Sequence, residues 1–408
     1  MKTLTSLCFA GIVGSSAVAS GNAFNINEHD AKVTGRGGTS AASDTDPSSI
    51  VFNPGGIAIG EGTNFALTGT LYIAKGSYTL DGSTDTVSTD SAPAVVPSMY
   101  MTSRINDMIA VGIALHFPFG LAISWPDNHP QSEVIQDQAL RTYFITPSVG
   151  FNLNKQVPGL SAGLGIDVVP ATVELSRAVL FGDTAGTAHL GGDALGIGAR
   201  AGVMYRPPSV PALKTGLMYR SPVKLAFSGK GDFDIADPYR SQLPPDGDIS
   251  TEITLPQSVV LGAAYDVMPE LELEVKTVWI DWDAFQELRI ALPGDVETVS
   301  PQKYHDTWSF KLGGEYALTK YKAAVRAGFI YDPTPIPPET LTAALPDVDR
   351  FNITLGGSKW FGKYGAHLGL LWVTPGERRT SDAMYMPQYK GTYSVQAFVA
   401  SVMVSGSL

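Results

Sequence analysis

Five basic side chains are the residues of this chain best suited to hold an anion. They are Arg200, Arg220, Lys276, Lys311 and Arg326. Each lies in a segment that alternates between apolar and polar residues, and a cation in water-poor surroundings forms a strong hydrogen bond with a carboxylate. The competing role is an ion pair with an acidic residue of the chain: Asp167, Glu272, Glu274 or Glu315. For any one of the five cations we expect the ion pair.

Two common motifs of enzymatic chemistry are missing from the sequence. It contains neither a His-Glu-x-x-His zinc motif nor a Gly-x-x-x-x-Gly-Lys-Ser/Thr phosphate loop. The six histidines show no metal-ligand spacing; they are His29, His116, His129, His189, His305 and His367. A Ser/His pair assembled only by the fold stays open as an alternative. We predict a protein that is not an enzyme and that holds no cofactor and no metal.

The composition excludes several classes of protein. Only 16% of the 408 residues are charged and 44% are hydrophobic, whereas disordered chains combine low hydrophobicity with high charge. A helical membrane protein needs apolar spans of about 20 residues, and this composition disfavours it. The net charge of −11 comes without a basic cluster, which disfavours nucleic-acid binding.

Residues 1–23 are predicted to be a secretory signal peptide. Lys2 supplies the positive start, and a run of apolar and small residues follows. Cleavage is expected at Ala19 or Ala23, because small residues precede signal cleavage sites. A single membrane anchor is the alternative, which the short run disfavours. Since Cys8 is the only cysteine, the mature chain needs no disulfide.

Apolar residues alternate with polar ones from Asn64 to the C-terminus, which is the pattern of strands with one apolar face. The segment 109–125 is so apolar that a membrane helix is the alternative there. It is shorter than such a helix, and Pro118 and Gly120 would disrupt a helix interior. We therefore predict a strand in this segment as well.

Fourteen strands are expected, and the lengths of their connections indicate how they are arranged. Short turns alternate with long polar loops, as in bacterial membrane barrels, which have an even number of strands. A soluble sandwich has no reason to sort its loops in this way. The expected strands span residues 63–80, 93–103, 108–125, 139–154, 159–177, 193–206, 211–230, 250–266, 270–290, 303–317, 320–331, 350–361, 363–374 and 390–405. The expected long loops are 81–92, 126–138, 178–192, 231–249, 291–302, 332–349 and 375–389.

Residues 24–62 interrupt this pattern, since small residues and turn formers dominate from Gly35 to Gly56. A fourteen-stranded barrel has a lumen wider than its own side chains can fill. We therefore predict an all-β, antiparallel transmembrane barrel formed by residues 63–408, with residues 24–62 as a plug, or hatch, inside the lumen. A periplasmic tail is the alternative for the N-terminal segment.

Several short motifs follow one another along the chain. They are Phe24 to Glu28, Gly35-Arg36 with Asn53-Pro54, Val96 to Met99, Ile105 to Asp107, Gly120 to Ala122, Tyr219 to Ser221, Trp279 to Phe285, and Tyr331-Asp332 with Pro346 to Phe351. In this order they resemble the outer-membrane long-chain fatty acid transporters, the FadL/TodX family. Two positions depart from the family: Gly55 replaces the usual alanine, and Leu408 replaces an aromatic final residue. Either the last strand stops near Val404 or the assembly signal is weak.

The resemblance implies an apolar pocket inside the barrel and a sideways exit through a gap beside a kinked third strand. In this sequence the kink would fall at Phe117, Pro118, Phe119 and Gly120. Independently of the family, proline cannot donate a ladder hydrogen bond and glycine weakens a strand. Phe24 is expected on the ligand path, and the inner face of the gap is expected to be Asn53, Pro54 and Gly55. The alternative is a bulge that only helps the wall to curve.

We therefore expect passive transport of hydrophobic compounds across the outer membrane of a Gram-negative bacterium, with long-chain fatty acids as the first candidate substrate. Aromatic hydrocarbons are the alternative within the same family. A general porin and a structural or adhesive barrel are the alternatives outside it. The expected partners are hydrophobic small molecules, outer-membrane lipid, lipopolysaccharide and the barrel assembly machinery. The protein is expected to be a monomer that binds no nucleic acid.

Overall fold

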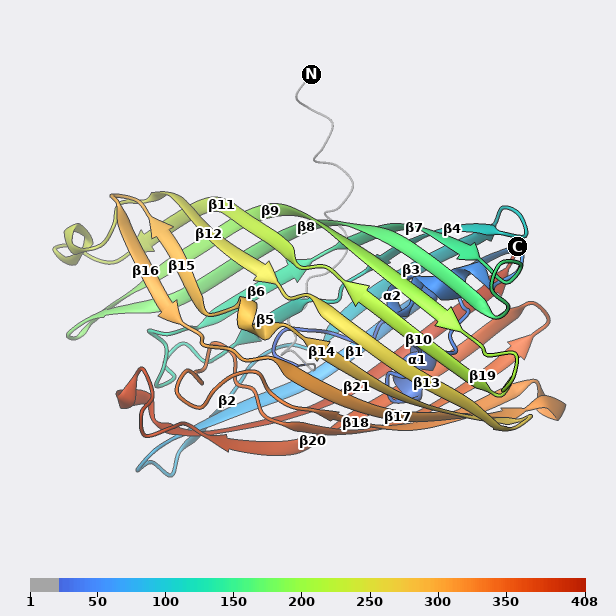
Figure 1. Cartoon of the computed structure of the whole chain (residues 1–408). Helices are drawn as coiled ribbons and strands as arrows, with labels where there is room; N and C mark the ends of the chain where they lie inside the picture. Colours follow the sequence, from blue (N-terminus) through green and yellow to red (C-terminus); the bar gives the residue numbers. More distant parts are fainter. Residues whose placement is uncertain (1–21) are drawn as a thin grey trace, which may run out of the picture.

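The alternating segments close into an antiparallel barrel in the computed structural model, which describes residues 22–408 (Figure 1). β1 (Thr63–Leu80) pairs on one side with β3 (Ala94–Arg104) and on the other side with the last strand, β21 (Gly391–Ser407). Because the first and last strands pair, the wall has no free edge at this seam that lipid would have to cover.

The C-terminal strand extends beyond Val404, where one of the two expectations had it stop. β21 pairs with β1 as far as Ser407, which lies opposite Asn64. A stop near Val404 is therefore wrong. At the other end of the chain, the predicted signal peptide (residues 1–23) lies outside the described residues except for its last two positions.

The wall has the fourteen predicted spans. Eight are single strands: β1, β3, β8 (Leu160–Phe181), β9 (Thr184–Tyr205), β18 (Ala323–Asp332), β19 (Arg350–Phe361), β20 (Tyr364–Arg379) and β21. Six consist of two strands each: β4 (Ile109–His116) with β5 (Gly120–Ser124), β6 (Asp137–Thr142) with β7 (Phe144–Asn152), β10 (Leu213–Arg220) with β11 (Val223–Asp234), β12 (Gly247–Leu255) with β13 (Ser258–Met268), β14 (Leu271–Ile280) with β15 (Glu287–Leu292), and β16 (Val296–Pro301) with β17 (Thr307–Leu318). The short β2 (Thr86–Ser88) pairs with β1 beside the first long loop.

Prolines mark three of the six interruptions. Pro118 lies between β4 and β5, Pro222 between β10 and β11, and Pro256 between β12 and β13. Proline has no N–H to donate to a strand ladder, so it is tolerated where pairing stops. Pro118 predicts the first interruption, whereas the expected strands 211–230 and 250–266 run through the other two.

The loop expected at residues 178–192 is instead part of the wall. β8 and β9 stay paired up to Phe181 and Thr184, and a tight turn with Gly182 at a φ of 59° joins them. A positive φ suits glycine because it has no Cβ. The segment is rich in Gly, Ala and Thr, and these residues resembled a loop because they carry no apolar stripe.

Side chains sort to the two faces of the wall as the alternation predicts. On β9, Leu195 and Ile197 are 66% and 69% exposed on the outside, whereas Arg200 is buried inside. An apolar outer face around a polar interior is the arrangement of a barrel that sits in a membrane.

The N-terminal segment fills part of the lumen, as predicted for a hatch (Figure 1). It contains two short helices, α1 (Ala31–Gly35) and α2 (Ser49–Phe52), and the 3-10 helix η1 (Pro54–Ala58), all of them buried. Asp30 begins α1 because its carboxylate accepts hydrogen bonds from the backbone N–H groups of the first turn. Gly35 is required where α1 meets β19, since a Cβ there would lie 2.7 Å from the Cα of Gly356.

The other helical segments are single 3-10 turns. They are η2 (Tyr239–Gln242), η3 (Trp282–Ala284), η4 (Thr319–Tyr321) and η5 (Pro387–Tyr389). Within residues 22–408, no helix has the length and apolar character needed to cross a membrane.

Candidate functional site

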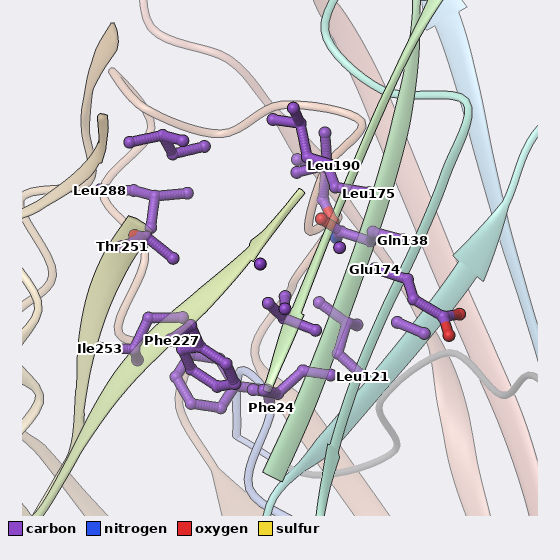
Figure 2. A pocket seen from close by; sticks show the side chains of 18 of the residues that line it. Phe24, Leu121, Gln138, Glu174, Leu175, Leu190, Phe227, Thr251, Ile253 and Leu288 are labelled. Carbon is purple, nitrogen blue, oxygen red and sulfur yellow. The ribbon is translucent and has the colours of Figure 1, made fainter. Parts of the chain in front are cut away.

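An apolar cavity lies between the N-terminal end of the hatch and the loop 333–349. Its empty volume, which includes the part open to solvent, is about 930 Å³. Phe24 comes from the hatch and Leu345 from the loop, and inward side chains of β5, β6, β8, β9, β11, β12 and β15 complete the lining. Figure 2 shows Phe24, Phe227 and Ile253 on one side of the void and Leu175 and Leu190 on another.

The wall is interrupted next to this cavity, at the position predicted for the kink. β4 ends at His116 and β5 begins at Gly120. β3 pairs with β4 only from Met99 to Arg104, and β5 pairs with β6. No ladder within residues 22–408 joins β3 to β5, so the wall has a gap in its pairing at this place.

The N-terminal end of the hatch lies against the gap from inside and supplies the missing backbone bonds. The Ile26 N–H donates to the carbonyl of Pro118 at 2.8 Å, and the Gly120 N–H donates to the carbonyl of Phe24 at 2.9 Å. Asn25 and Phe119 form the bridge between these two bonds. Residues 24–26 therefore act as a short extra strand at a position where unpaired backbone would be costly.

Phe24 contacts both the cavity and the gap. Its ring lines the cavity, and ring centroids lie 4.8 Å away at Trp282, 5.9 Å at Phe285 and 6.0 Å at Phe119. Phe119 belongs to the interrupted segment, so the phenyl ring of Phe24 connects the two regions.

Arg220 is the predicted cation that lies beside the gap. Its guanidinium carbon is 4.5 Å from the centre of the Phe119 ring, and the residue is buried. No acidic side chain of the described chain forms an ion pair with it, and its Nε has no hydrogen-bond partner there. A buried charge without a partner is costly, which makes Arg220 a candidate to bind an anionic group.

The other four predicted cations are in contact with carboxylates or with the hatch. Arg200 pairs with Asp167, with Nε 3.0 Å from Oδ1, and it also donates to the hatch carbonyl of Val51. Arg326 Nε donates to Glu315 at 2.6 Å. Lys276 Nζ donates to the Gly38 carbonyl at 2.5 Å, and Lys311 packs against Gly38 as well. For Arg200 and Arg326, the expected ion pairs are confirmed.

Asn53, Pro54 and Gly55 lie against β9 and not at the inner face of the gap, where they were expected. The Asn53 amide donates to the carbonyls of Ala41 and Val203, and its oxygen accepts from the Gly55 N–H at 3.1 Å. A Cβ at Gly55 would lie 3.2 Å from the backbone nitrogen of Met204. These residues therefore fasten the hatch to β9. Residues 24–26 occupy the inner face of the gap instead.

The strand-like role of residues 24–26 had a weak signal in the sequence. Phe24-Asn25-Ile26-Asn27 alternates between apolar and polar residues, which is the pattern of a short strand. The contributions of Tyr304 and the loop 333–349 to the cavity had no comparable signal, since these segments turn inward only in the folded barrel.

The hatch is held by buried charges that face it from the wall. Glu274 accepts hydrogen bonds from the Ala41 and Ala42 N–H groups at 2.8 and 3.1 Å and from the Ser43 hydroxyl at 2.8 Å. Arg36 donates to Glu274 at 3.3 Å and to Glu272 at 2.7 Å. Charge-assisted bonds of this kind are stronger than bonds between neutral groups.

Burial shifts the pKa values of several titratable groups of the hatch, among them two acids and a histidine. Burial raises the pKa of Asp44 to about 7, although Lys32 opposes the rise. Burial also raises the pKa of Glu28, against the influence of Lys311. Burial lowers the pKa of His29 to about 3. Among residues 22–408, no group of three His, Cys, Asp or Glu side chains has the arrangement of a metal site.

Known proteins share both the sequence and the architecture. A family model described as outer membrane protein transport protein (OMPP1/FadL/TodX) matches residues 12–402. The chain is 26% identical over 388 residues to the long-chain fatty acid transport protein of Salmonella typhi, covering 86% of each chain. The corresponding protein of Escherichia coli K12 is 25% identical over 385 residues, which cover 83% of this chain and 84% of the relative.

Solved structures agree with the fold. The crystal structure of a Pseudomonas aeruginosa FadL homologue superposes with a TM-score of 0.83 at 19% identity, covering 94% of this chain and 99% of the homologue. The toluene transporter TodX of P. putida superposes with a TM-score of 0.73 at 17% identity, covering 96% and 99%. Because the family model spans nearly the whole chain, the protein belongs to the OMPP1/FadL/TodX family of outer membrane transport proteins.

Proposed function

We propose that the protein carries hydrophobic compounds passively across the outer membrane, and that its substrates are long-chain fatty acids. The Salmonella typhi relative is named for long-chain fatty acids, whereas TodX is named for toluene. Aromatic hydrocarbons are therefore the second candidate class. The apolar cavity suits both classes, so the choice between them depends on whether the site also recognises a charged head group.

The position of Arg220 carries the proposal of an acidic substrate. Arg220 is buried next to Phe119 and has no acidic partner in the described chain, and the ring of Phe24, which contacts Phe119, lines the apolar cavity. A fatty acid would place its chain in the cavity and its carboxylate on Arg220, which would satisfy the buried charge. A hydrocarbon would leave that charge unsatisfied.

The gap between β3 and β5 is the proposed exit. Each CH₂ group kept out of water is worth about 0.8 kcal/mol, so a fatty acid is carried at lower cost into the bilayer than into the aqueous periplasm. Displacement of residues 24–26 from Phe119 and Gly120 would connect the cavity with the lipid at the side of the barrel. The contacts of Phe24 with both regions support this route.

Uptake into liposomes that contain the purified protein tests the proposal. We expect oleate to enter faster than in protein-free liposomes, with little entry of a small sugar. Entry of toluene without oleate would reassign the substrate class. Entry of the sugar would indicate a general porin, and entry of none of the three would indicate a structural or adhesive barrel.

A further inference from the structure

The outer face of the wall changes from apolar to polar along one line of strand partners. On β9, Leu195 and Ile197 are the last outward apolar residues before this line, and both are strongly exposed. The line itself consists of one outward residue from each of β6, β8, β9 and β11: Arg141, Thr172, Asp193 and Ser228. Because the apolar band of a barrel lies in the hydrocarbon of the membrane, the polar face beyond this line stands in the head-group layer.

This polar face belongs to the external side of the membrane. The hairpin of β8 and β9 and the loop between β11 and β12 extend away from the end of the barrel that holds the C-terminus (Figure 1). The loop between β11 and β12 is one of the long ones, and bacterial barrels have their long loops outside and their short turns in the periplasm. The external leaflet of an outer membrane consists of lipopolysaccharide, so its sugars form the layer that this face meets.

Two further rows of strand partners form a hollow in this face. Its empty volume, part of which is open to solvent, is about 970 Å³. The first row is Ala139, Glu174, Gly191 and Lys230, and the second row is Asp137, Ser176, His189 and Asp232. Ala139 and Gly191 lie on either side of Glu174 and carry almost no side chain, which leaves the space. The two rows lie within about 13 Å of strand from the polar line.

Some of the polar groups in the hollow already have partners. Arg141 pairs with Glu174 at 3.1 Å, and Asp137 accepts a hydrogen bond from the Ser176 hydroxyl at 3.3 Å. These contacts hold donors and carboxylate oxygens in fixed places next to one another. The hollow is therefore preorganised, and a ligand that binds there orders few additional side chains.

Other groups in the hollow have no partner. His189 and Asp232 are exposed, and their side chains form no hydrogen bond or ion pair within residues 22–408. A carboxylate only accepts hydrogen bonds, whereas an imidazole can donate one, and a sugar hydroxyl both donates and accepts. A phosphate without a counter-ion would be repelled by the carboxylates of Asp137, Glu174 and Asp232. The hollow therefore suits a neutral sugar better than a bare anion.

We propose that this hollow binds the core oligosaccharide of a neighbouring lipopolysaccharide molecule. A sugar ring would lie over Gly191, with its hydroxyl groups on His189 and Asp232. The lipid anchor of the same molecule would lie on the apolar band next to the hollow, at Leu195 and Ile197, so that the hollow continues the surface by which the barrel meets the membrane. The inference rests on the outer-membrane location and is independent of the substrate that is transported.

Native mass spectrometry of the full processed chain in detergent tests the proposal. The protein is mixed with equal amounts of lipid A, which has no core sugars, and of lipopolysaccharide with a complete core. Because both ligands have the same lipid anchor, the ratio of the two complexes measures the contribution of the sugars. We expect a preference of about tenfold for the complete core, the effect of one or two net hydrogen bonds. Equal binding of the two ligands would overturn the proposal.

A substitution that fills the hollow locates the contact. A Cβ at Gly191 would have only the Val173 carbonyl within 4 Å, at 3.8 Å, so Gly191→Leu should leave the β-sheet circular dichroism unchanged while the preference falls to about one. Gly69→Leu is the matched control, because Gly69 lies on the outer face of β1 next to Leu67 and nothing would lie within 4 Å of its Cβ. A preference that survives Gly191→Leu, or that is lost equally in Gly69→Leu, would overturn the location.

A chelator separates sugars from phosphates. Phosphate groups on the core could reach Asp137, Glu174 and Asp232 only through a divalent cation, whereas hydroxyl groups bind these side chains directly. The preference for the complete core should therefore persist in EDTA. A preference that disappears in EDTA would assign the contact to phosphate bridged by a metal ion and would overturn the proposal.

Discussion

Arg220 differs from the paired cations of the lumen because an aromatic ring takes the place that a carboxylate occupies elsewhere. The sequence alone predicted five candidates and could not separate them. In the β8–β9 register Gly198 lies opposite Asp167, so Arg200, two residues further along β9, is its diagonal neighbour on the same face of the wall. The sequence could not give this register, because residues 178–192 were expected to be a loop. The partner of Lys276 is a hatch carbonyl, which no strand pattern can reveal.

Replacing Arg220 with glutamine should weaken fatty-acid binding and spare hydrocarbons. A hydrogen bond to a charged group contributes about 1.5–3 kcal/mol, so we expect the Kd for oleate to rise roughly 10- to 100-fold. Binding of an alkane of the same chain length, measured by fluorescence competition, should change little. Arg326→Gln serves as the control because Arg326 already pairs with Glu315. An equal loss for oleate and alkane would rule out a carboxylate contact at Arg220.

Glu274 should be the residue on which hatch docking depends most. Its carboxylate is fully buried and accepts from Ala41, Ala42 and Ser43. Glu274→Ala leaves these three donors without their acceptor and Arg36 with Glu272 alone, and each buried donor left unsatisfied costs about 1–3 kcal/mol. We expect faster proteolysis of the hatch in a barrel that stays folded. Glu315→Gln, which alters a wall pair outside the hatch, should leave the hatch protected, and similar proteolysis of both variants would contradict this role.

At the scale of elements, the sequence predicted the fourteen spans well and their interruptions poorly. Alternation is a local pattern, so each span could be recognised from its own residues. Pro222 and Pro256 carried the same signal as Pro118, but the expected strands ran across them. The partner of the β4–β5 break is the hatch segment 24–26, and a contact between segments so far apart along the chain leaves no trace in local periodicity.

Straightening the break should stop transport without unfolding the barrel. We expect a variant in which Phe117 to Gly120 are replaced by a regular alternating strand to pair with β3 and close the gap. A side chain at position 120 would also press on the hatch, since a Cβ there lies 3.0 Å from Cδ1 of Ile26. Liposome uptake of oleate should fall to the protein-free rate while the β-sheet circular dichroism is retained.

Pro222→Thr provides the matched control for that experiment, because it changes a proline at another interruption of the wall. Its uptake should equal that of the unmodified protein. If the straightened variant still delivers oleate at the normal rate, exit between β3 and β5 is wrong.

At the scale of the whole molecule, the barrel is divided between a polar part that holds the hatch and an apolar part that holds the cavity. In Figure 1, α1 and α2 lie toward the end where the chain terminates, and β15, β16, β11 and β12 extend toward the opposite end. The sequence predicted a segment inside the lumen from its small residues. It did not predict that the loop 333–349 would fold inward, because a polar external loop and a loop that covers the cavity have similar compositions.

Docking of the hatch should respond to pH through two groups with opposite signs. Burial raises the pKa of Asp44 to about 7, so the docked hatch binds this proton more tightly than a released hatch. Its contribution favours docking in acid and is lost as the pH rises toward 7. Burial lowers the pKa of His29 to about 3. A released hatch binds that proton more tightly, so this contribution favours docking above about pH 6.5 and is lost in acid.

Because Glu28 also has a raised pKa, variants made in a Glu28→Gln background should separate the two effects, while the unmodified protein shows a flatter response. In His29→Gln only Asp44 remains, and the hatch should dock more firmly at about pH 5 than at about pH 7. In Asp44→Asn only His29 remains, and the hatch should dock less firmly at about pH 5 than at about pH 7. Hydrogen exchange of the α1 and α2 amides, expressed as a ratio to the unmodified protein at the same pH, cancels the intrinsic pH dependence of exchange. Ratios that move in the same direction for both variants would show that burial does not control these groups as proposed.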